Sequence, residues 1–195
     1  MESINIPSKI IIDERIRLIK LEEGFNEKKL ISNLRIINDK AIQNFLGFNK
    51  DINREIEDIK EKMLKKKNIY YSIYRENEFI GWFYLYDINQ KYKRANLSLG
   101  IKENLRGHIL SLKAINTIIE NLFESGFNRL GLEIEDTNQT MLKLVKHMEK
   151  IGFKYEGKLR DNYGLNINSN VWSLLKREYN KKEDFIDFSS LDKIR

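Results

Sequence analysis

The sequence has no cysteine, one proline, two histidines and no long hydrophobic run. Without cysteine the chain forms no disulfide, thiolate zinc site, iron–sulfur cluster or thiol nucleophile. Two histidines are too few for a histidine-rich metal site. No run approaches the roughly 18 apolar residues that cross a bilayer. The first 20 residues contain Glu2, Asp13 and Glu14 and do not read as a secretory signal. We therefore expect a cytoplasmic protein without a metal site.

The composition indicates one folded domain with a short tail. Of the 195 residues, 33% are charged and 41% hydrophobic, a balance typical of soluble globular proteins and not of disordered ones. A single proline and the lack of any Gly/Ser-rich stretch leave no visible interdomain linker. The sequence predicts a single domain over residues 1–180 and a C-terminal tail over residues 181–195.

The chain is basic, with a formal net charge of +6, which suits an anionic partner such as a nucleotide. The charge alone says little, because 35 basic residues are interspersed with 29 acidic ones. Trp82, Phe83, Tyr84 and Tyr86 could stack on nucleic-acid bases. Their alternation within a predicted central strand favours core packing instead. Nucleic acid is therefore the weakest of the partners that we consider.

Hydrophobic periodicity predicts an α+β domain with a mixed central sheet of about seven strands flanked by helices. The predicted strands cover residues 15–21, 70–74, 79–86, 95–101, 129–134, 153–159 and 171–176. Helical spacing of apolar residues occurs over residues 26–49, 52–66, 109–123 and 140–150.

Short motifs in a fixed order between residues 12 and 180 carry a family resemblance. They are Ile80-Gly81, Leu105-Arg106-Gly107, Gly152-Phe153, Glu156-Gly157, Leu159-Arg160-Asp161 and Ser173-Leu174-Leu175. Together they resemble the RimJ/RimL-type branch of the GNAT N-acetyltransferases, and the series is more specific than any single glycine motif. The resemblance implies the GNAT fold and direct transfer of an acetyl group from acetyl-CoA to a primary amine. The amine would belong to a protein N-terminus, an amino sugar or a small molecule, and family members often form homodimers.

The resemblance also implies where acetyl-CoA binds. Leu99, Gly100 and Ile101 would hold the pantetheine arm, and Asn138 would match the family's asparagine after the fifth strand. The loop before the long helix would bind the pyrophosphate, because backbone N–H groups at a helix N-terminus favour an anion. The residues of this loop and first helical turn are Arg106, Gly107, His108, Ile109, Leu110 and Ser111.

Acyl transfer to an amine needs a group that takes up the amine's proton and a group that protonates the leaving thiolate. Glu133 and Glu135 alternate with the apolar face of the predicted strand over residues 129–134 and are the carboxylates available near the cleft. Solvated strand positions are the alternative interpretation. Tyr155 and Tyr163 are candidate proton donors, with packing as their alternative role.

The chain departs from the family pattern where the chemistry should lie. Ile109 occupies the place of the second loop glycine, and its Cβ crowds an approaching phosphate. Asn96 replaces a frequent glutamate, while Met141, Leu144 and Met148 stand where polar residues are common. These departures leave a second hypothesis open, a non-catalytic GNAT-fold binding module that has lost acetyl-CoA chemistry.

Overall fold

The computed structural model describes residues 4–22, 25–26, 28–30, 52–65, 67–102, 105 and 109–179. Most of the helical region predicted over residues 26–49 lies outside the described residues. So do Arg106, Gly107 and His108 of the predicted pyrophosphate loop, and the predicted tail over residues 181–195. None of the helices in the described ranges is long and apolar enough to cross a membrane.

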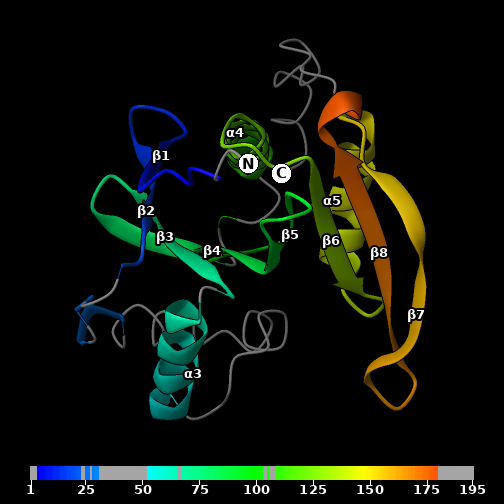
Figure 1. Cartoon of the computed structure of the whole chain (residues 1–195), viewed down its shortest axis with the longest axis horizontal. Helices are drawn as coiled ribbons and strands as arrows, with labels where there is room; N and C mark the ends of the chain where they lie inside the picture. The colour runs from blue at the N-terminus through cyan, green and yellow to red at the C-terminus, as the bar shows by residue number, and fades with distance from the viewer. Residues whose placement is uncertain are drawn as a thin grey trace.

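A mixed sheet of eight strands runs through the molecule in the order β1-β2-β3-β4-β5-β6-β8-β7 (Figure 1). Only β5 and β6 pair in parallel, and all other neighbours are antiparallel. The predicted mixed sheet is confirmed, with one more strand than expected. The strands are β1 Lys9–Ile11, β2 Ile16–Lys20, β3 Ile69–Arg75, β4 Glu78–Asn89, β5 Arg94–Ile101, β6 Arg129–Glu135, β7 Lys154–Gly164 and β8 Ile167–Leu175.

Helices cover both faces of the sheet (Figure 1). Alternation in β3 and β4 sends Tyr70 and Trp82 into a cluster with Ile59 of α3, whereas Tyr71 and Phe83 join the main core with α4. The crossover between the parallel strands β5 and β6 is α4, as parallel pairing requires. The described helices are α3 Ile52–Leu64, α4 Ile109–Glu124, α5 Gln139–Lys150 and the short 3-10 helix η2 Lys176–Glu178.

The sheet opens between β5 and β6. These strands pair only from Arg94 and Arg129 to Asn96 and Gly131, although β5 continues to Ile101 and β6 to Glu135. Beyond Asn96 the strands diverge, so that β6, β8 and β7 form a second arm at an angle to β1–β5 (Figure 1). The opening lies toward the carboxyl ends of the two parallel strands, the edge at which α/β sheets commonly bind ligands.

Candidate active site

A pocket occupies the opening between β5 and β6. Its wall is mostly apolar, with Leu97 and Leu99 from β5, Leu132 from β6 and Ile115 and Ile118 from α4. The polar residues Glu133, Glu135, Asn138 and Tyr163 also line this pocket. The sequence-predicted site residues that line this pocket are Leu99, Glu133, Glu135, Asn138 and Tyr163.

The end of β5 offers an extended segment along the opening. Leu99, Gly100 and Ile101 pair with Phe83, Trp82 and Gly81 of β4 on one side. On the other side the ladder to β6 has already ended. This arrangement suits a long, narrow ligand lying against the strand, which is the role predicted for these three residues.

Helix α4 begins at Ile109, soon after β5 ends, and its first turn contains no acidic residue. The helix N-terminus therefore carries a favourable partial charge for an anion. Arg106, Gly107 and His108, together with the side chains of Ile109, Leu110 and Ser111, are outside the described part of the chain. Their predicted contact with a pyrophosphate stays a prediction.

Two carboxylates face the pocket from β6. Glu133 and Glu135 lie on the strand face opposite Leu132 and Ile134, as the alternation predicts, and both are half-buried. Asn162 Nδ2 donates a hydrogen bond to Glu133 Oε1, and the Thr137 hydroxyl donates one to Glu135 Oε1. Neither carboxylate forms an ion pair with any residue that the structure describes. Their negative charge is therefore available to a cationic or protonated ligand.

Two tyrosines, Tyr163 and Tyr86, lie near Glu133. Tyr163 of β7 lies next to it, and burial followed by the charge and hydrogen bonding of Glu133 raises the pKa of the Tyr163 hydroxyl above its ordinary value. Tyr84 and Tyr86 of β4 have ring centroids 5.7 Å apart. Burial, and then the charge of Glu133, raises the pKa of Tyr86 as well. The hydroxyls of Tyr163 and Tyr86 thus stay protonated at neutral pH and can donate hydrogen bonds.

Tyr155 lies apart from this group. Its hydroxyl donates to Asn170 Oδ1 at 3.2 Å, and its ring packs edge-on against Trp172 with centroids 5.2 Å apart. Trp172 Nε1 in turn donates to Glu149 of α5, and Tyr155 does not line the pocket. The geometry favours Tyr163 over Tyr155 as a proton donor at this site.

Asn138 borders the pocket as the N-cap of α5. Its side-chain Oδ1 accepts a hydrogen bond from the backbone N–H of Met141 at 3.0 Å, which satisfies one of the free donors at the start of the helix. The residue is only 5% exposed. Asn138 therefore shapes the pocket wall through the helix that it begins.

Two residues near Glu133, Tyr86 and Asn162, are not among the site residues predicted from the sequence. The sequence favours core packing for Tyr84 and Tyr86 and gives no signal for Asn162. Alternation along β4 does place Tyr84 and Tyr86 on one face, but only the fold brings that face toward β6. Asn96, at the place of a frequent family glutamate, donates to Asp87 Oδ2 at 3.3 Å and so has a carboxylate beside it.

The chain belongs to a known class of enzymes. A sequence profile of the Acetyltransferase (GNAT) family matches residues 35–153. The protein is therefore a member of the GNAT acetyltransferase family, in agreement with the expected fold. A search of curated proteins finds no match.

Solved structures with the same fold include three acetyltransferases. A RimL ribosomal alpha-N-protein acetyltransferase matches with a TM-score of 0.73 and 15% identity over 86% of this chain and 93% of the other. A microcin self-immunity acetyltransferase, in complex with acetyl-CoA and AMP, has a TM-score of 0.67 and 21% identity over 89% and 98%. The spermidine N-acetyltransferase of Vibrio cholerae, in complex with CoA and spermine, has a TM-score of 0.68 and 18% identity over 86% and 99%. At these identities the likeness shows the shared fold.

Proposed function

We propose that the protein transfers the acetyl group of acetyl-CoA to a primary amine by direct attack of the amine on the thioester. The observation that carries this proposal is the early end of the β5–β6 ladder at Asn96 and Gly131. The resulting pocket has the extended end of β5 on one side and Glu133 with Tyr163 on the other. The β5 side suits a long, narrow ligand. The side with Glu133 and Tyr163 holds a proton acceptor and a proton donor, which acyl transfer to an amine needs.

The residues around the opening fit acetyl-CoA as a co-substrate. The backbone of Leu99–Ile101 would hold the pantetheine arm, with the apolar side chains of the pocket around it. The start of α4, with the predicted loop residues Arg106–Ser111, would hold the pyrophosphate. Bound in this way, acetyl-CoA supplies an activated acetyl group at the pocket.

The polar wall provides the proton transfers. Glu133 accepts the proton that the acceptor's ammonium group must lose, directly or through a water molecule. Tyr163, protonated at neutral pH, donates a proton to the leaving thiolate. Glu135 supplies a second negative charge that attracts a cationic acceptor. Direct transfer needs no nucleophile of the protein's own, which agrees with the absence of cysteine.

The acceptor class follows from the same wall. Two carboxylates without cationic partners among the described residues favour an amine that reaches the pocket positively charged. The relatives of known activity are named for a ribosomal protein N-terminus and for spermidine, which are both amines. We propose a primary amine of a protein N-terminus, an amino sugar or a small molecule as acceptor.

One observation supports the alternative function, a binding module without catalysis. Met141 and Met148 line the pocket where polar side chains are common in the family. Such a module would keep the pocket without turning over acetyl-CoA.

A coupled assay separates the two functions. Release of free CoA from acetyl-CoA is followed with a thiol reagent while a panel of amines is added: spermidine, amino sugars, and peptides with free or blocked N-termini. The protein itself contributes no thiol background. The proposal expects amine-dependent CoA release that the Glu133→Gln variant loses. No release with any amine, from a protein that still binds acetyl-CoA, would establish the module instead.

A further inference from the structure

The β7–β8 hairpin leaves regular pairing beside the pocket. Leu159 pairs with Ser169 and Gly164 pairs with Ile167, so five residue steps on β7 face only two on β8. The extra residues form a bulge in β7. Within the bulge, Asp161 has a φ of 53°, in the left-handed region that Asp and Asn tolerate better than most residues.

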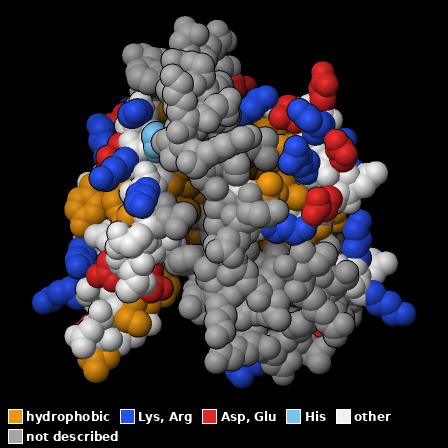
Figure 2. All heavy atoms as spheres, turned by 180° about the vertical axis from the view of Figure 1, so that it is seen from behind, with side chains coloured by type: hydrophobic (Ala, Val, Ile, Leu, Met, Phe, Trp, Pro, Cys, Tyr) orange, Lys and Arg blue, Asp and Glu red, His pale blue; other side chains and the backbone are white. Residues whose placement is uncertain are grey.

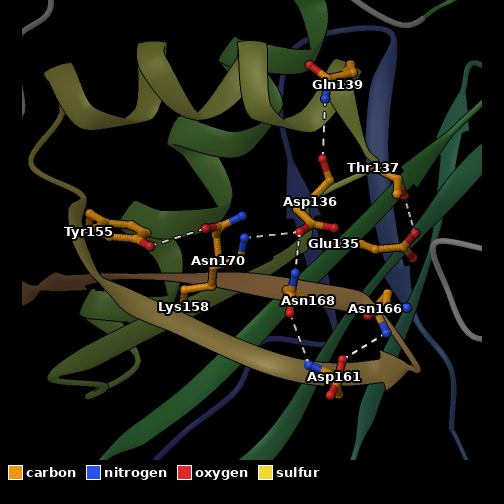
Figure 3. Close-up of polar contacts among 10 residues, drawn as sticks. All are labelled: Glu135, Asp136, Thr137, Gln139, Tyr155, Lys158, Asp161, Asn166, Asn168 and Asn170. Carbon is orange, nitrogen blue, oxygen red and sulfur yellow. Dashed lines mark hydrogen bonds and ion pairs between the residues drawn. The ribbon is translucent and has the colours of Figure 1, made fainter.

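The side chain of Asn168 in β8 and a backbone N–H of the hairpin turn hold this bulge in place. Asn168 Oδ1 accepts a hydrogen bond from the backbone N–H of Asp161 at 3.1 Å. Asp161 Oδ1 accepts one from the backbone N–H of Asn166 at 2.8 Å. Figure 3 shows the two contacts on either side of Asp161. They keep Asp161 in its left-handed conformation.

Asn168 is itself tied to the turn between β6 and α5. Its Nδ2 donates to Asp136 Oδ2 at 2.9 Å, and the backbone N–H of Asp136 donates to the Asn168 carbonyl at 3.0 Å (Figure 3). Lys158 Nζ lies 3.3 Å from the same carboxylate oxygen. A continuous chain of contacts therefore runs from the end of β6, through β8, to the bulge in β7.

The bulge places the side chains of Asn162 and Tyr163 beside Glu133. Asn162 follows Asp161 directly, and its Nδ2 donates both to Ser169 Oγ at 3.0 Å and to Glu133 Oε1. Ser169 is small and fully buried, which lets Asn162 lie across β8 to reach β6. Tyr163, the next residue, lies beside the same carboxylate.

From this chain of contacts we propose that Asp136 and Asn168 are positioning residues for acetyl transfer. They hold the Asp161 bulge so that Asn162 and Tyr163 orient the Glu133 carboxylate in the pocket. Neither Asp136 nor Asn168 lines the pocket, so each acts through the bulge and not on a substrate. The proposal rests on the function proposed above, because it concerns the same carboxylate.

A matched pair of variants tests the role of Asn168. Asn168→Ala removes the side-chain hydrogen bonds to Asp136 and Asp161. Asn170→Ala removes a half-buried asparagine of the same strand that is bonded to Tyr155 instead. Asn168→Ala is expected to lower kcat by about tenfold to a hundredfold, the cost of a small misplacement of a reacting group, with the KM for acetyl-CoA unchanged. Asn170→Ala is expected to retain kcat. Equal losses in both variants would overturn the proposal.

A double-mutant cycle shows whether Asn168 acts through Glu133. In a Glu133→Gln background, Asn168→Ala is expected to cause a smaller fold-loss in kcat than in the wild type, because the carboxylate that it positions is already gone and only the placement of Tyr163 is left to disturb. The same fold-loss in both backgrounds would show a general structural effect and contradict the proposal. Asp161→Asn, which keeps the acceptor oxygen and tolerates the left-handed conformation, should retain kcat, while Asp161→Ala should lose it.

A spectroscopic readout tests the geometry without turnover. In a ¹H–¹⁵N spectrum the side-chain amide of Asn162 reports its hydrogen bond to Glu133. Asn168→Ala and Glu133→Gln should both move this resonance toward that of a solvent-exposed asparagine, and Asn170→Ala should not. An unmoved resonance in folded Asn168→Ala overturns the positioning proposal. A wild-type protein that binds acetyl-CoA but transfers no acetyl group to any amine overturns the proposed function alone.

Discussion

Glu133 is the residue on which the proposed chemistry depends. It is half-buried at the pocket, accepts a hydrogen bond from Asn162, and has no cationic partner in the described residues. A carboxylate held by a neutral amide keeps its charge available for an incoming ammonium group. A carboxylate in an ion pair would already be neutralised by a cation of the protein and would attract the ammonium group less strongly.

Replacement of Glu133 tests its role as proton acceptor. Glu133→Gln keeps the size of the side chain but removes the base, so kcat should fall by about a hundredfold or more, the usual contribution of a positioned general base. Acetyl-CoA binding, measured by calorimetry, should be unchanged. A larger loss in Glu135→Gln than in Glu133→Gln would assign the base to Glu135.

A pair of tyrosine variants tests the proton donor. Tyr163→Phe should lower kcat by about tenfold or more, while Tyr155→Phe, outside the pocket, should retain it. Because the pKa of Tyr163 is raised, its ionisation should not reduce kcat below about pH 10. The pH profile of kcat and the two variants check this. A loss in Tyr155→Phe with none in Tyr163→Phe would contradict the assignment.

Asp136 gives a prediction for stability against pH. The hydrogen bond from Asn168, and then Lys158, hold the pKa of Asp136 below its usual value of 3.8. A carboxyl whose pKa is lowered by folding contributes stability above its unfolded pKa and loses it as the pH falls through its folded pKa. Thermal unfolding should therefore show Asp136→Asn less stable than wild type at pH 7. The difference should shrink as the pH falls through the folded pKa of Asp136, which lies below 3.8. A difference that does not shrink would contradict the charge-based explanation.

Among the elements, β4 and β5 set the shape of the side of the pocket where we propose that acetyl-CoA binds. A Cβ at Gly81 of β4 would collide with the backbone carbonyl of Gly100 in β5. A Cβ at Gly131 of β6 would instead meet the end of the Asn96 side chain. The first contact is with backbone and the second with a side chain that can rotate. A substitution at Gly81 must therefore displace the backbone of β5, whereas a substitution at Gly131 need only rotate the side chain of Asn96.

Alanine at these two glycines measures that difference. Gly81→Ala should lower the free energy of unfolding by about 1–3 kcal/mol, the usual cost of overpacking, and weaken acetyl-CoA binding by displacing Leu99–Ile101. Gly131→Ala should cost less, because Asn96 can turn away and lose only its contact with Asp87. Denaturant titration and calorimetry provide the two readouts. Equal stability of Gly81→Ala and wild type would contradict the proposed strand packing.

The sequence predicted most elements because their periodicity is strong. The helix expected over residues 109–123 is α4, and the strand expected over residues 95–101 is β5. Strand β1 was missed because three residues are too few to show alternation. Strand β7 runs past residue 159 to Gly164, since the bulge at Asp161 interrupts the pattern that would have revealed it.

At the scale of the whole molecule, the site depends on how the two arms of the sheet meet. The family resemblance directs attention to β5 and β6, and five of the predicted site residues line the pocket between these strands. The resemblance could not place Asn162 beside Glu133, because 29 residues separate them and the contact crosses β8. The alternation of residues along a strand predicts which face of the sheet each side chain lies on. The bulge in β7 and the angle between the two arms of the sheet determine which of these faces come together.

The charged side chains of the described residues are of both signs. On the face shown in Figure 2, basic and acidic side chains of the described residues are interspersed and do not form one continuous basic patch. Such a surface gives no support there to an extended nucleic-acid interface, which would need basic side chains gathered along one stripe.

We propose that acetyl-CoA binds in the opening between β5 and β6. Calorimetric titration of the wild-type protein with acetyl-CoA tests this, with free CoA as competitor and Arg106→Ala as the variant that removes a predicted phosphate contact. We expect saturable binding of about one acetyl-CoA per chain below millimolar concentration, competition by CoA, and weaker binding in Arg106→Ala. No binding of acetyl-CoA at millimolar concentration would contradict it.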